Sequence, residues 1–355
     1  MSNQLPSLTI CSVYHSEMTA RILEMNGIFI RKMNPNISWT YLAVNNSPQE
    51  SIHLKSAGIK EFPGVPLPEN LPPYPGPIST WSSYTGYFDG GASNSLLKHI
   101  KTRFVVFLDY DFFIVRPNWI NDVLSYMEKE NIGILGAPYH PKYWVKFRYF
   151  PSKNCIFVDR EKIGKEFYDW DFRPQYSIEE VKKTMTAARH KAEQKAKHPK
   201  PPPSKLRRFF QSIRKRHYLG LSKDVGFNLR RRYYGQNKIK YECFQSTVVL
   251  NDFLYHYYLD GRWHKLLYQL EKLVPERWSF VPKKKNYFTF KSFKNVGFFD
   301  VLSAGMEEWW WREVPFGFHL RGFKERHLKE IGENFDPEEN IRIIKTATDN
   351  FTYHQ

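Results

Sequence analysis

A short, continuous apolar run in the first third of the chain constrains the fold most. Residues 104–108 read Phe-Val-Val-Phe-Leu and lead directly into Asp109-Tyr110-Asp111. An apolar run of this length is typical of a buried strand, because it shows none of the helical spacing of polar residues. We therefore predict that two carboxylates lie at the carboxyl end of a buried strand.

The residues before this run predict an α/β layer. Residues 8–14 form another apolar strand, hydrophobic residues recur at helical spacing through 18–33, and a second strand is predicted at 39–44. This order indicates a mostly parallel sheet, whose ligands bind beyond the carboxyl ends of the strands. Tyr14 and Asn45 are predicted at two of these ends, where they either contact a nucleoside or form ordinary turns.

The residues around the two aspartates extend the same pattern. Residues 90–94, Gly-Gly-Ala-Ser-Asn, are predicted to precede a short helix, and a longer helix is predicted at 119–127. Two further short strands are predicted at 132–137 and 155–158. We expect residues 1–176 to form one half of the domain.

The second half of the chain begins after a basic insertion, which we place at 177–218. Prolines at 199–203 break its helix-like part, and residues 204–218 form a basic amphipathic helix. That helix either binds an anionic lipid surface or is a solvated face. The remainder, 219–355, is predicted to be helical and aromatic.

Four predictions within that remainder are specific. Helices are expected near 247–259 and 265–273, and loops are expected to carry Trp309-Trp310-Trp311 and residues 317–322. We favour core packing for the three tryptophans over stacking on a sugar.

Composition and net charge limit the classes of partner that this protein could bind. The 355 residues carry a net charge of +17, which attracts nucleic acid, anionic lipid or phosphorylated small molecules. No run approaches the roughly 18 apolar residues of a membrane span, the first residues do not resemble a secretory signal, and the three separated cysteines suit reduced thiols. These features predict a cytoplasmic protein, with peripheral membrane association as an added expectation.

Asp109 and Asp111 are candidate metal ligands. Two carboxylates at this spacing repel each other, and a divalent cation is a natural way to keep both ionised. Oxygen ligands suit Mg²⁺ or Mn²⁺, which would keep open positions for diphosphate oxygens. The alternative is a turn in which both aspartates cap the following backbone.

At this point the chain resembles glycosyltransferases of the GT-A fold, especially the large inverting group related to cellulose and chitin synthases. The resemblance is carried by residues 105–111, an apolar strand ending in Asp-x-Asp, with residues 90–94 before them. It implies a mixed, mostly parallel sheet flanked by helices, with an acceptor-binding half after it. It also implies a nucleoside-diphosphate sugar donor, linked to UDP or GDP, and a hydroxyl acceptor such as a glycan, a lipid-linked sugar or a polysaccharide precursor.

The resemblance implies roles for four residues in donor binding. Asp111 would bind the metal, Asp109 would contact the metal or the donor ribose, and Asn94 with Gly91 would lie near the donor sugar. The metal would stabilise the charge that develops on the departing diphosphate.

An inverting enzyme also needs a carboxylate to accept the proton of the acceptor hydroxyl. We expect Asp224 in this role, because it follows the insertion where such a fold places its base. The alternative is a surface cap for a helix at 227–231. Glu242 and Asp171 are further candidates.

His319 and Arg321 lie in a glycine-bounded segment that resembles the late histidine with which some GT-A enzymes complete the metal site. His319 would then bind the metal and Arg321 the diphosphate. The alternative for His319 is a structural histidine.

Two other functions stay open at this stage. Basic and aromatic residues interleave at 230–234, which is compatible with a nucleic-acid-binding protein, although no recognised module supports one and we expect no nucleic acid. An apolar strand ending in Asp-x-Asp also opens a class of phosphatase sites. There the motif stands near the start of the domain and is followed by Thr or Val, where this chain has Phe113.

Overall fold

The structure is a computed structural model of the whole chain. It describes residues 7–47, 52–56, 58–64, 89–140, 149–163, 226–236, 238–247, 288–289, 307–320 and 337–353, with scattered positions between 179 and 204 and at 270 and 273. Asp224, Arg321, Asp171 and, apart from Ser204, the basic segment 204–218 lie outside these residues. The boundaries expected at 176 and 218 lie outside them too, so the domain division stays a prediction.

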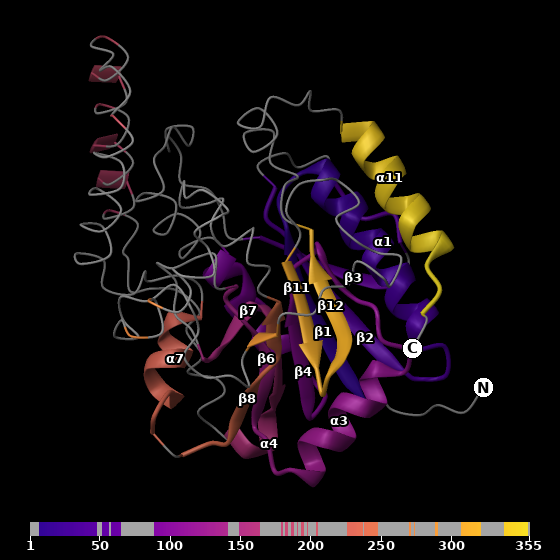
Figure 1. Cartoon of the computed structure of the whole chain (residues 1–355). Coiled ribbons are helices and arrows are strands. Elements are labelled where there is room, and N and C mark those ends of the chain that lie inside the picture. The colour runs from indigo at the N-terminus through magenta and orange to yellow at the C-terminus, as the bar shows by residue number, and fades with distance from the viewer. Residues whose placement is uncertain are drawn as a thin grey trace.

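A seven-stranded sheet forms the centre of the molecule, in the order β3-β2-β1-β4-β7-β6-β8 (Figure 1). The strands are β1 (Leu8–Tyr14), β2 (Trp39–Asn45), β3 (Ile59–Pro63), β4 (Phe104–Leu108), β6 (Ile134–Pro138), β7 (Pro151–Asp159) and β8 (Tyr241–Cys243). Only β7 runs antiparallel to its neighbours, β4 and β6, while the other described pairs are parallel. This confirms the predicted mixed, mostly parallel α/β sheet.

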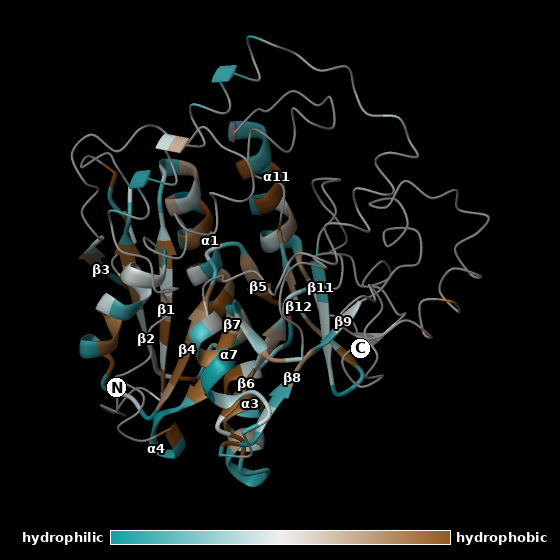
Figure 2. Ribbon diagram, turned by 90° about the vertical axis from the view of Figure 1, so that its left-hand side faces the viewer, coloured by the Kyte–Doolittle hydropathy of each residue, from teal (hydrophilic) through white to brown (hydrophobic). Residues whose placement is uncertain are grey.

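The strand predictions rest on burial, and the burial is observed. Every residue of β1, β4, β6 and β7 is buried. The hydrophobic colouring of strands such as β4 is visible in Figure 2. A strand that is covered on both faces must be apolar throughout, which is why the continuous runs at 8–14 and 104–108 predict these strands well.

Helices cover the sheet. The first is α1 (Glu17–Met33), which begins at a capping box of Ser16 and Thr19 and continues through Asn26 and Gly27. A Cβ atom on Gly27 would come within 3.3 Å of Ile59 Cδ1, so this glycine allows the helix to lie close to the sheet. Helix α11 (Pro337–Asn350) lies beside α1 in Figure 1.

The helix α3 (Trp119–Lys129) has the predicted position. Its start is fixed by a buried asparagine of the α1 C-terminus: Asn34 Oδ1 accepts a hydrogen bond from the backbone N–H of Ile120 at 3.0 Å. The short α4 (Arg160–Ile163) follows β7, and α7 (Phe227–Tyr233) covers the helix anticipated at 227–231. The N-cap of α7 is Gly226, and no side chain caps it.

The prediction that residues 90–94 precede a helix was wrong in its boundary. Residues 89–96 are themselves helical and are followed by the single turn η1 (Leu97–His99). Leu96 and Leu97 pack with Ala92 in the core on one face of the sheet. Tertiary packing therefore outweighs the low helix propensity of the two glycines.

A second, five-stranded sheet has the order β10-β9-β11-β12-β5. Its strands are β5 (Phe112–Ile114), β9 (Gln245–Thr247), β10 (Phe288–Thr289), β11 (Glu307–Trp311) and β12 (Val314–His319). Because β5 begins one residue after Asp111, the second sheet starts where the first sheet's central strand ends.

This second sheet corrects two predictions from the sequence and the start of a third. Residues 309–311 and 317–319 are strands rather than loops, and Thr247 ends a strand, while the rest of the helix expected near 247–259 lies outside the described residues. All three tryptophans are buried, as favoured above. The loop prediction failed because a strand covered on both faces shows no alternation of polar and apolar residues.

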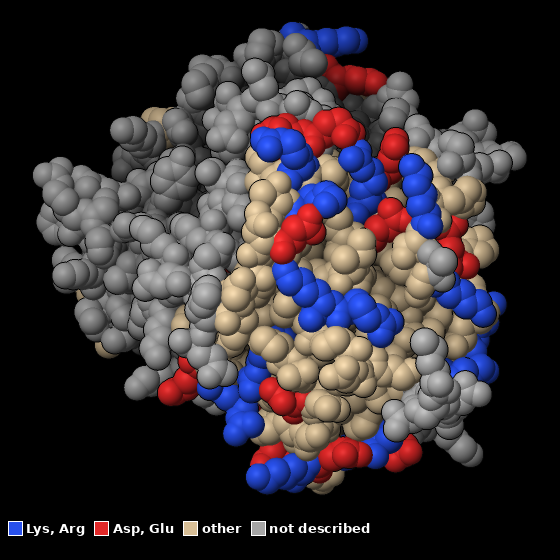
Figure 3. All heavy atoms as spheres, turned by 90° about the vertical axis from the view of Figure 1, so that its right-hand side faces the viewer, with Lys and Arg blue, Asp and Glu red and all other residues tan. Residues whose placement is uncertain are grey.

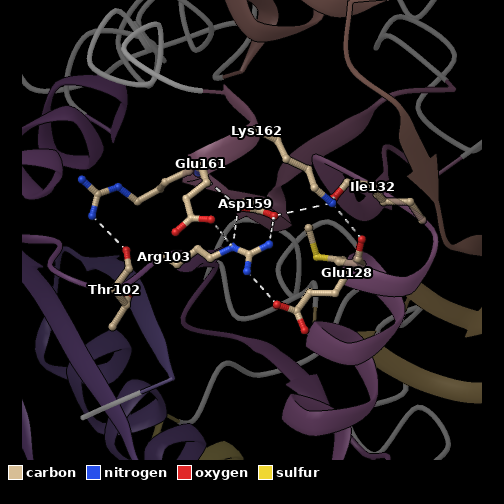
Figure 4. A network of polar contacts seen from close by, with 9 residues as sticks. Thr102, Arg103, Glu128, Ile132, Asp159, Glu161 and Lys162 are labelled. Carbon is tan, nitrogen blue, oxygen red and sulfur yellow. Dashed lines mark hydrogen bonds and ion pairs between the residues drawn. The ribbon is translucent and has the colours of Figure 1, made fainter.

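A network of ion pairs joins the amino end of β4 to the end of β7 (Figure 4). Arg103 Nε and Nη2 donate to the two oxygens of the fully buried Asp159 carboxylate at 3.1 and 2.8 Å. Arg103 also pairs with Glu128 at 2.7 Å, and Lys162 Nζ lies 3.6 Å from Asp159. The hydrogen bonds with Asp159 raise the pKa of Arg103, and this effect is larger than the lowering that burial causes.

The cysteines, the helices and the surface charges complete the description of the fold. The three cysteines are buried and form no disulfide. Among the described helices, none combines the length and the apolar character that crossing a bilayer requires. On the face shown in Figure 3, basic and acidic side chains of the described residues are interspersed.

Candidate metal centre

Asp109, Asp111 and His319 meet at the carboxyl end of β4. One ligand atom from each lies within 4.8 Å of the other two. His319 Nε2 is 2.8 Å from Asp111 Oδ1 and 3.7 Å from Asp109 Oδ2. These are three of the residues that the sequence proposed as metal ligands, and the structure brings all three together.

Strand pairing is the reason why residues so distant in sequence meet. β12 runs antiparallel to β5, and His319 stands opposite Phe112, the residue directly after Asp111. The backbone N–H of Leu320 donates to the carbonyl of Asp111 at 2.9 Å, which extends the pairing to the aspartate itself. The position of the histidine is therefore fixed by backbone hydrogen bonds on both of its sides.

The turn that carries the two aspartates is anchored from three directions. Phe112 N–H donates to Asp109 C=O at 3.0 Å, and Asp109 N–H donates to Asn154 C=O at 2.9 Å. Asn26, buried on α1, donates its amide to the carbonyls of Tyr110 at 3.2 Å and Phe112 at 2.9 Å. Asn26, in the middle of α1, therefore supports the turn.

The three side chains differ in exposure. The side chain of Asp109 is 26% exposed, whereas those of Asp111 and His319 are 9% and 4% exposed. An ion held by all three would therefore be reached from solvent on the side of Asp109. A buried pair of ligands and one more open ligand leave room for a substrate oxygen at the ion.

The donor set fits Mn²⁺ or Mg²⁺. Neighbouring ligand atoms of an octahedral ion with bonds of about 2.1 Å lie about 3 Å apart. The separation of 2.8 Å between His319 Nε2 and Asp111 Oδ1 is near this value, and the 3.7 Å to Asp109 Oδ2 is longer. Carboxylate oxygens suit both ions, and an imidazole ligand makes Mn²⁺ the better match of the two.

Glu307 is a site residue that the sequence reasoning missed. Its fully buried side chain belongs to β11, and its Oε2 atom lies 3.3 Å from His319 Nδ1. Asn154 Nδ2 is near the same ring nitrogen at 3.5 Å, and Phe112 and Trp309 pack against the ring. Only a prediction of the β11–β12 hairpin, which pairs Glu307 with His319, would have found it.

Tyr14 and Asn45 lie at the ends of β1 and β2, as predicted. In this structure their polar atoms bind the segment 52–56 and β3: Tyr14 Oη donates to Glu61 at 2.6 Å, and Asn45 Nδ2 donates to Ile52 C=O at 2.5 Å. Burial, and then the hydrogen bond to Glu61, raise the pKa of Tyr14.

The ends of β1 and β4 are in direct contact. The His15 ring lies edge to face with the Tyr110 ring, 5.4 Å between centroids. The predicted nucleoside region, which begins at Tyr14, is therefore next to the Asp109-Tyr110-Asp111 turn. A nucleotide at one would reach the other.

The remaining predicted residues are placed as follows. Gly91 is buried and Asn94 is partly buried in the helical residues 89–96. Glu242 lies within β8, where its carboxylate accepts a hydrogen bond from Tyr126 Oη at 2.8 Å. Asp224 and Arg321 are outside the described residues, although Arg321 directly follows Leu320.

No family model matches this sequence, and no curated protein does either. Among solved structures, the chain is similar to Staphylococcus aureus TarS 1–349 with 14% identity, a TM-score of 0.32, and coverage of 51% of this chain and 55% of TarS. It is also similar to the mannosyltransferase PcManGT from Pyrobaculum calidifontis, solved with GDP-Man and Mn²⁺ (12% identity, TM-score 0.30, 45% and 46% coverage). A third is the galactosyltransferase LgtC, solved with donor and acceptor sugar analogues (14% identity, TM-score 0.29, coverage of 50% of this chain and 69% of LgtC). The match spans about half the length of the first two.

Proposed function

We propose that this protein is a glycosyltransferase that moves a sugar from a nucleoside-diphosphate sugar to a hydroxyl acceptor. The observation that carries the proposal is the meeting of Asp109, Asp111 and His319 at the carboxyl end of β4. Open α/β sheets bind their ligands outside the carboxyl ends of their strands, so the cluster is where a nucleotide would be expected.

The three ligands have different tasks in this proposal. Asp111 and His319, which are almost fully buried, bind a Mn²⁺ or Mg²⁺ ion on the side away from solvent. The more exposed Asp109 either binds the same ion beside the donor or contacts the donor ribose. When bound, the ion neutralises the negative charge that the diphosphate acquires as the bond to the sugar breaks.

The donor extends from the metal centre along the ends of β1 and β2. Tyr14 and Asn45 flank the nucleoside, and the contact between His15 and Tyr110 connects this region with the metal centre. Gly91 and Asn94 lie near the donor sugar, and Arg321 binds the diphosphate. A guanidinium suits that role, because it donates two parallel hydrogen bonds to phosphate oxygens.

Transfer with inversion needs one more group, a base for the acceptor hydroxyl. We propose Asp224 for it. The N-cap of α7 is Gly226, so this helix start does not need Asp224 as its cap. Asp224→Asn should spare donor binding and abolish transfer, and normal transfer by this variant would place the base elsewhere.

Direct titration tests the proposal. Isothermal calorimetry should show that UDP or GDP binds in the presence of Mn²⁺ and binds far more weakly without it. A panel of UDP- and GDP-linked sugars should then reveal one whose slow hydrolysis depends on Mn²⁺. Strongly salt-dependent binding to RNA or DNA with no binding to either nucleotide would refute the proposal, and so would metal-dependent release of phosphate from simple phosphate esters alone.

The acceptor is proposed to be a glycan or a lipid-linked sugar, and the basic residues 204–218 to bind anionic membrane surfaces. A positively charged amphipathic helix binds such surfaces through its apolar face and its charges. The protein should sediment with vesicles that contain phosphatidylserine, and a variant that lacks residues 204–218 should not. Equal sedimentation of both proteins would remove the membrane from the proposal.

A further inference from the structure

Glu307 occupies a position that neither the sequence nor the chemistry of sugar transfer assigns. It is a fully buried carboxylate in the second sheet, directly opposite His319 in the antiparallel pair of β11 and β12. Residues that stand opposite each other in such a pair project from the same face of the sheet. The pairing therefore places the carboxylate beside the imidazole.

The carboxylate is next to the far side of the ring, away from the metal ligands. Glu307 Oε2 lies 3.3 Å from Nδ1, whereas the oxygens of Asp111 and Asp109 lie 2.8 and 3.7 Å from Nε2. The two nitrogens of an imidazole point in different directions. Glu307 is therefore not a fourth ligand of the ion, and its burial keeps it from touching a substrate.

We infer that Glu307 is a positioning residue that holds His319 in the tautomer able to bind the metal. A neutral imidazole carries one proton, and the nitrogen without it is the one that can bind a cation. A carboxylate beside Nδ1 favours the form with the proton on that nitrogen, and Asp111, whose oxygen lies 2.8 Å from Nε2, no longer competes for the proton once it binds the ion. Nε2 then presents its lone pair to the ion between Asp109 and Asp111.

The other neighbour of Nδ1 makes this selection necessary. Asn154 Nδ2 is a donor at 3.5 Å from the same nitrogen, and by itself it would favour the tautomer with the proton on Nε2. That tautomer has no lone pair for a metal. The carboxylate at 3.3 Å opposes it and also orients the ring, as partners of metal-bound histidines commonly do.

The chain supplies a matched control. Glu308 is the next residue of β11 and is also buried, with 3% exposure, but it stands opposite Phe318 and projects from the other face of the strand. A change at Glu308 disturbs the same strand to a similar extent and leaves His319 with its carboxylate partner.

The inference rests on the proposed metal centre, and the affinity for Mn²⁺ without nucleotide tests the two separately. The wild-type protein, Glu307→Leu, Glu307→Gln and Glu308→Leu are titrated with Mn²⁺ by calorimetry, with thermal unfolding as a check of the fold. Glu307→Leu should bind Mn²⁺ about 10- to 100-fold more weakly, as expected when the partner of a metal-bound histidine is lost. Glu307→Gln should lose less, because its amide oxygen can still face Nδ1 as an acceptor.

The contrary outcomes are distinct. A wild-type protein that does not bind Mn²⁺ refutes the metal centre and the proposed function with it. Wild-type affinity in folded Glu307→Leu, or an equal loss in Glu308→Leu, refutes only the role of Glu307.

A spectroscopic measurement tests the tautomer directly, and Glu307→Gln tests the residue when Glu307→Leu fails to fold. Proton–nitrogen spectra of the Mg²⁺-bound wild-type protein, labelled at the histidine ring nitrogens, report which nitrogen of His319 carries the proton. The signals are assigned by their absence in His319→Asn. A proton on Nδ1 is the expected result, and a proton on Nε2 would overturn the inference.

Discussion

Buried carboxylates lie near both ends of strand β4, but the negative charge at the two ends is balanced in different ways. At the amino end, the buried Asp159 carboxylate receives two hydrogen bonds from Arg103 and lies 3.6 Å from Lys162. At the carboxyl end, Asp109 and Asp111 surround the single imidazole of His319.

The difference separates a structural cluster from the proposed binding site. A guanidinium carries its charge at every accessible pH, so the network around Arg103 is permanently balanced by the chain itself. An imidazole is charged only in part of the pH range. If the proposed metal ion binds, an exchangeable cation would balance the charge of the carboxyl end, and the four predictions that follow test this contrast.

The largest effect is expected from Asp111→Asn. The substitution keeps the size of the side chain and removes the charge of the most buried carboxylate ligand, so the affinity for Mn²⁺ should fall by at least about 100-fold, more than for loss of an indirect partner. Calorimetric titration measures it. Undiminished Mn²⁺ binding would show that the cluster is not a metal centre.

The opposite pattern is expected from Arg103→Met. It leaves the buried Asp159 with a hydrogen bond from Glu161 N–H and with Lys162 at 3.6 Å. The free energy of unfolding should therefore fall by about 2–4 kcal/mol, somewhat less than for a fully buried pair. Urea denaturation measures the loss, and Mn²⁺ affinity should stay at its wild-type value. As a control, Glu128→Gln removes a partner whose side chain is 52% exposed and should cost less than about 1 kcal/mol. A large change in Mn²⁺ affinity would mean that the two ends are coupled.

Asn26→Ala should affect stability and metal binding together. It removes two hydrogen bonds to the turn between Asp109 and Asp111, which should cost about 1–3 kcal/mol of folding free energy. The loosened turn should also weaken Mn²⁺ binding several-fold. Asn34→Ala is the matched control, because this buried asparagine on the same helix bonds Ile30 and Ile120 instead. Equal effects of both variants on Mn²⁺ affinity would contradict the role of Asn26.

The smallest effect concerns Glu61, a carboxylate of β3 whose hydrogen bonds come from Leu54 N–H, Tyr14 and His53 rather than from an arginine. Burial by itself would raise its pKa, but hydrogen bonds from Leu54 N–H, Tyr14 and His53 lower the pKa below its ordinary value of 4.5. A lowered pKa in the folded state contributes stability above pH 4.5, and this contribution is lost as the pH falls through the folded-state value.

Glu61→Gln should therefore cost about 1 kcal/mol at neutral pH, as for the loss of charge-assisted hydrogen bonds, and progressively less in acid. Urea denaturation of both proteins across the acidic range measures the difference. A difference that grows as the pH falls would have the wrong sign for this explanation.

The parts of the fold that follow from local pattern were predicted well. The predicted strand at 8–14 and helices at 18–33 and 119–127 agree with β1, α1 and α3 to within one or two residues. A strand buried on both faces appears in the sequence as a continuous apolar run, and a helix buried on one side appears as apolar residues at helical spacing. The β11–β12 hairpin has no such trace, since Trp309, Trp310 and Trp311 are all buried and adjacent.

Candidate residues show the same division. Asp109 and Asp111 are recognisable because a buried strand immediately precedes them. His319 was selected by resemblance, while Glu307 was missed entirely. Its role depends on which residue of β12 stands opposite it, and strand register depends on long-range packing that no local pattern encodes.

By itself, the sequence determined that a buried strand ends in two aspartates inside a mostly parallel α/β sheet, because apolar runs of this length are stable only between covering layers. Only the tertiary structure decided that a histidine 208 residues beyond Asp111 comes within 2.8 Å of it, with Glu307 behind. The pairing of β12 with β5 on one side and β11 on the other sets that arrangement. Such pairings are chosen by the whole core, since a shift of one residue would turn His319 to the opposite face.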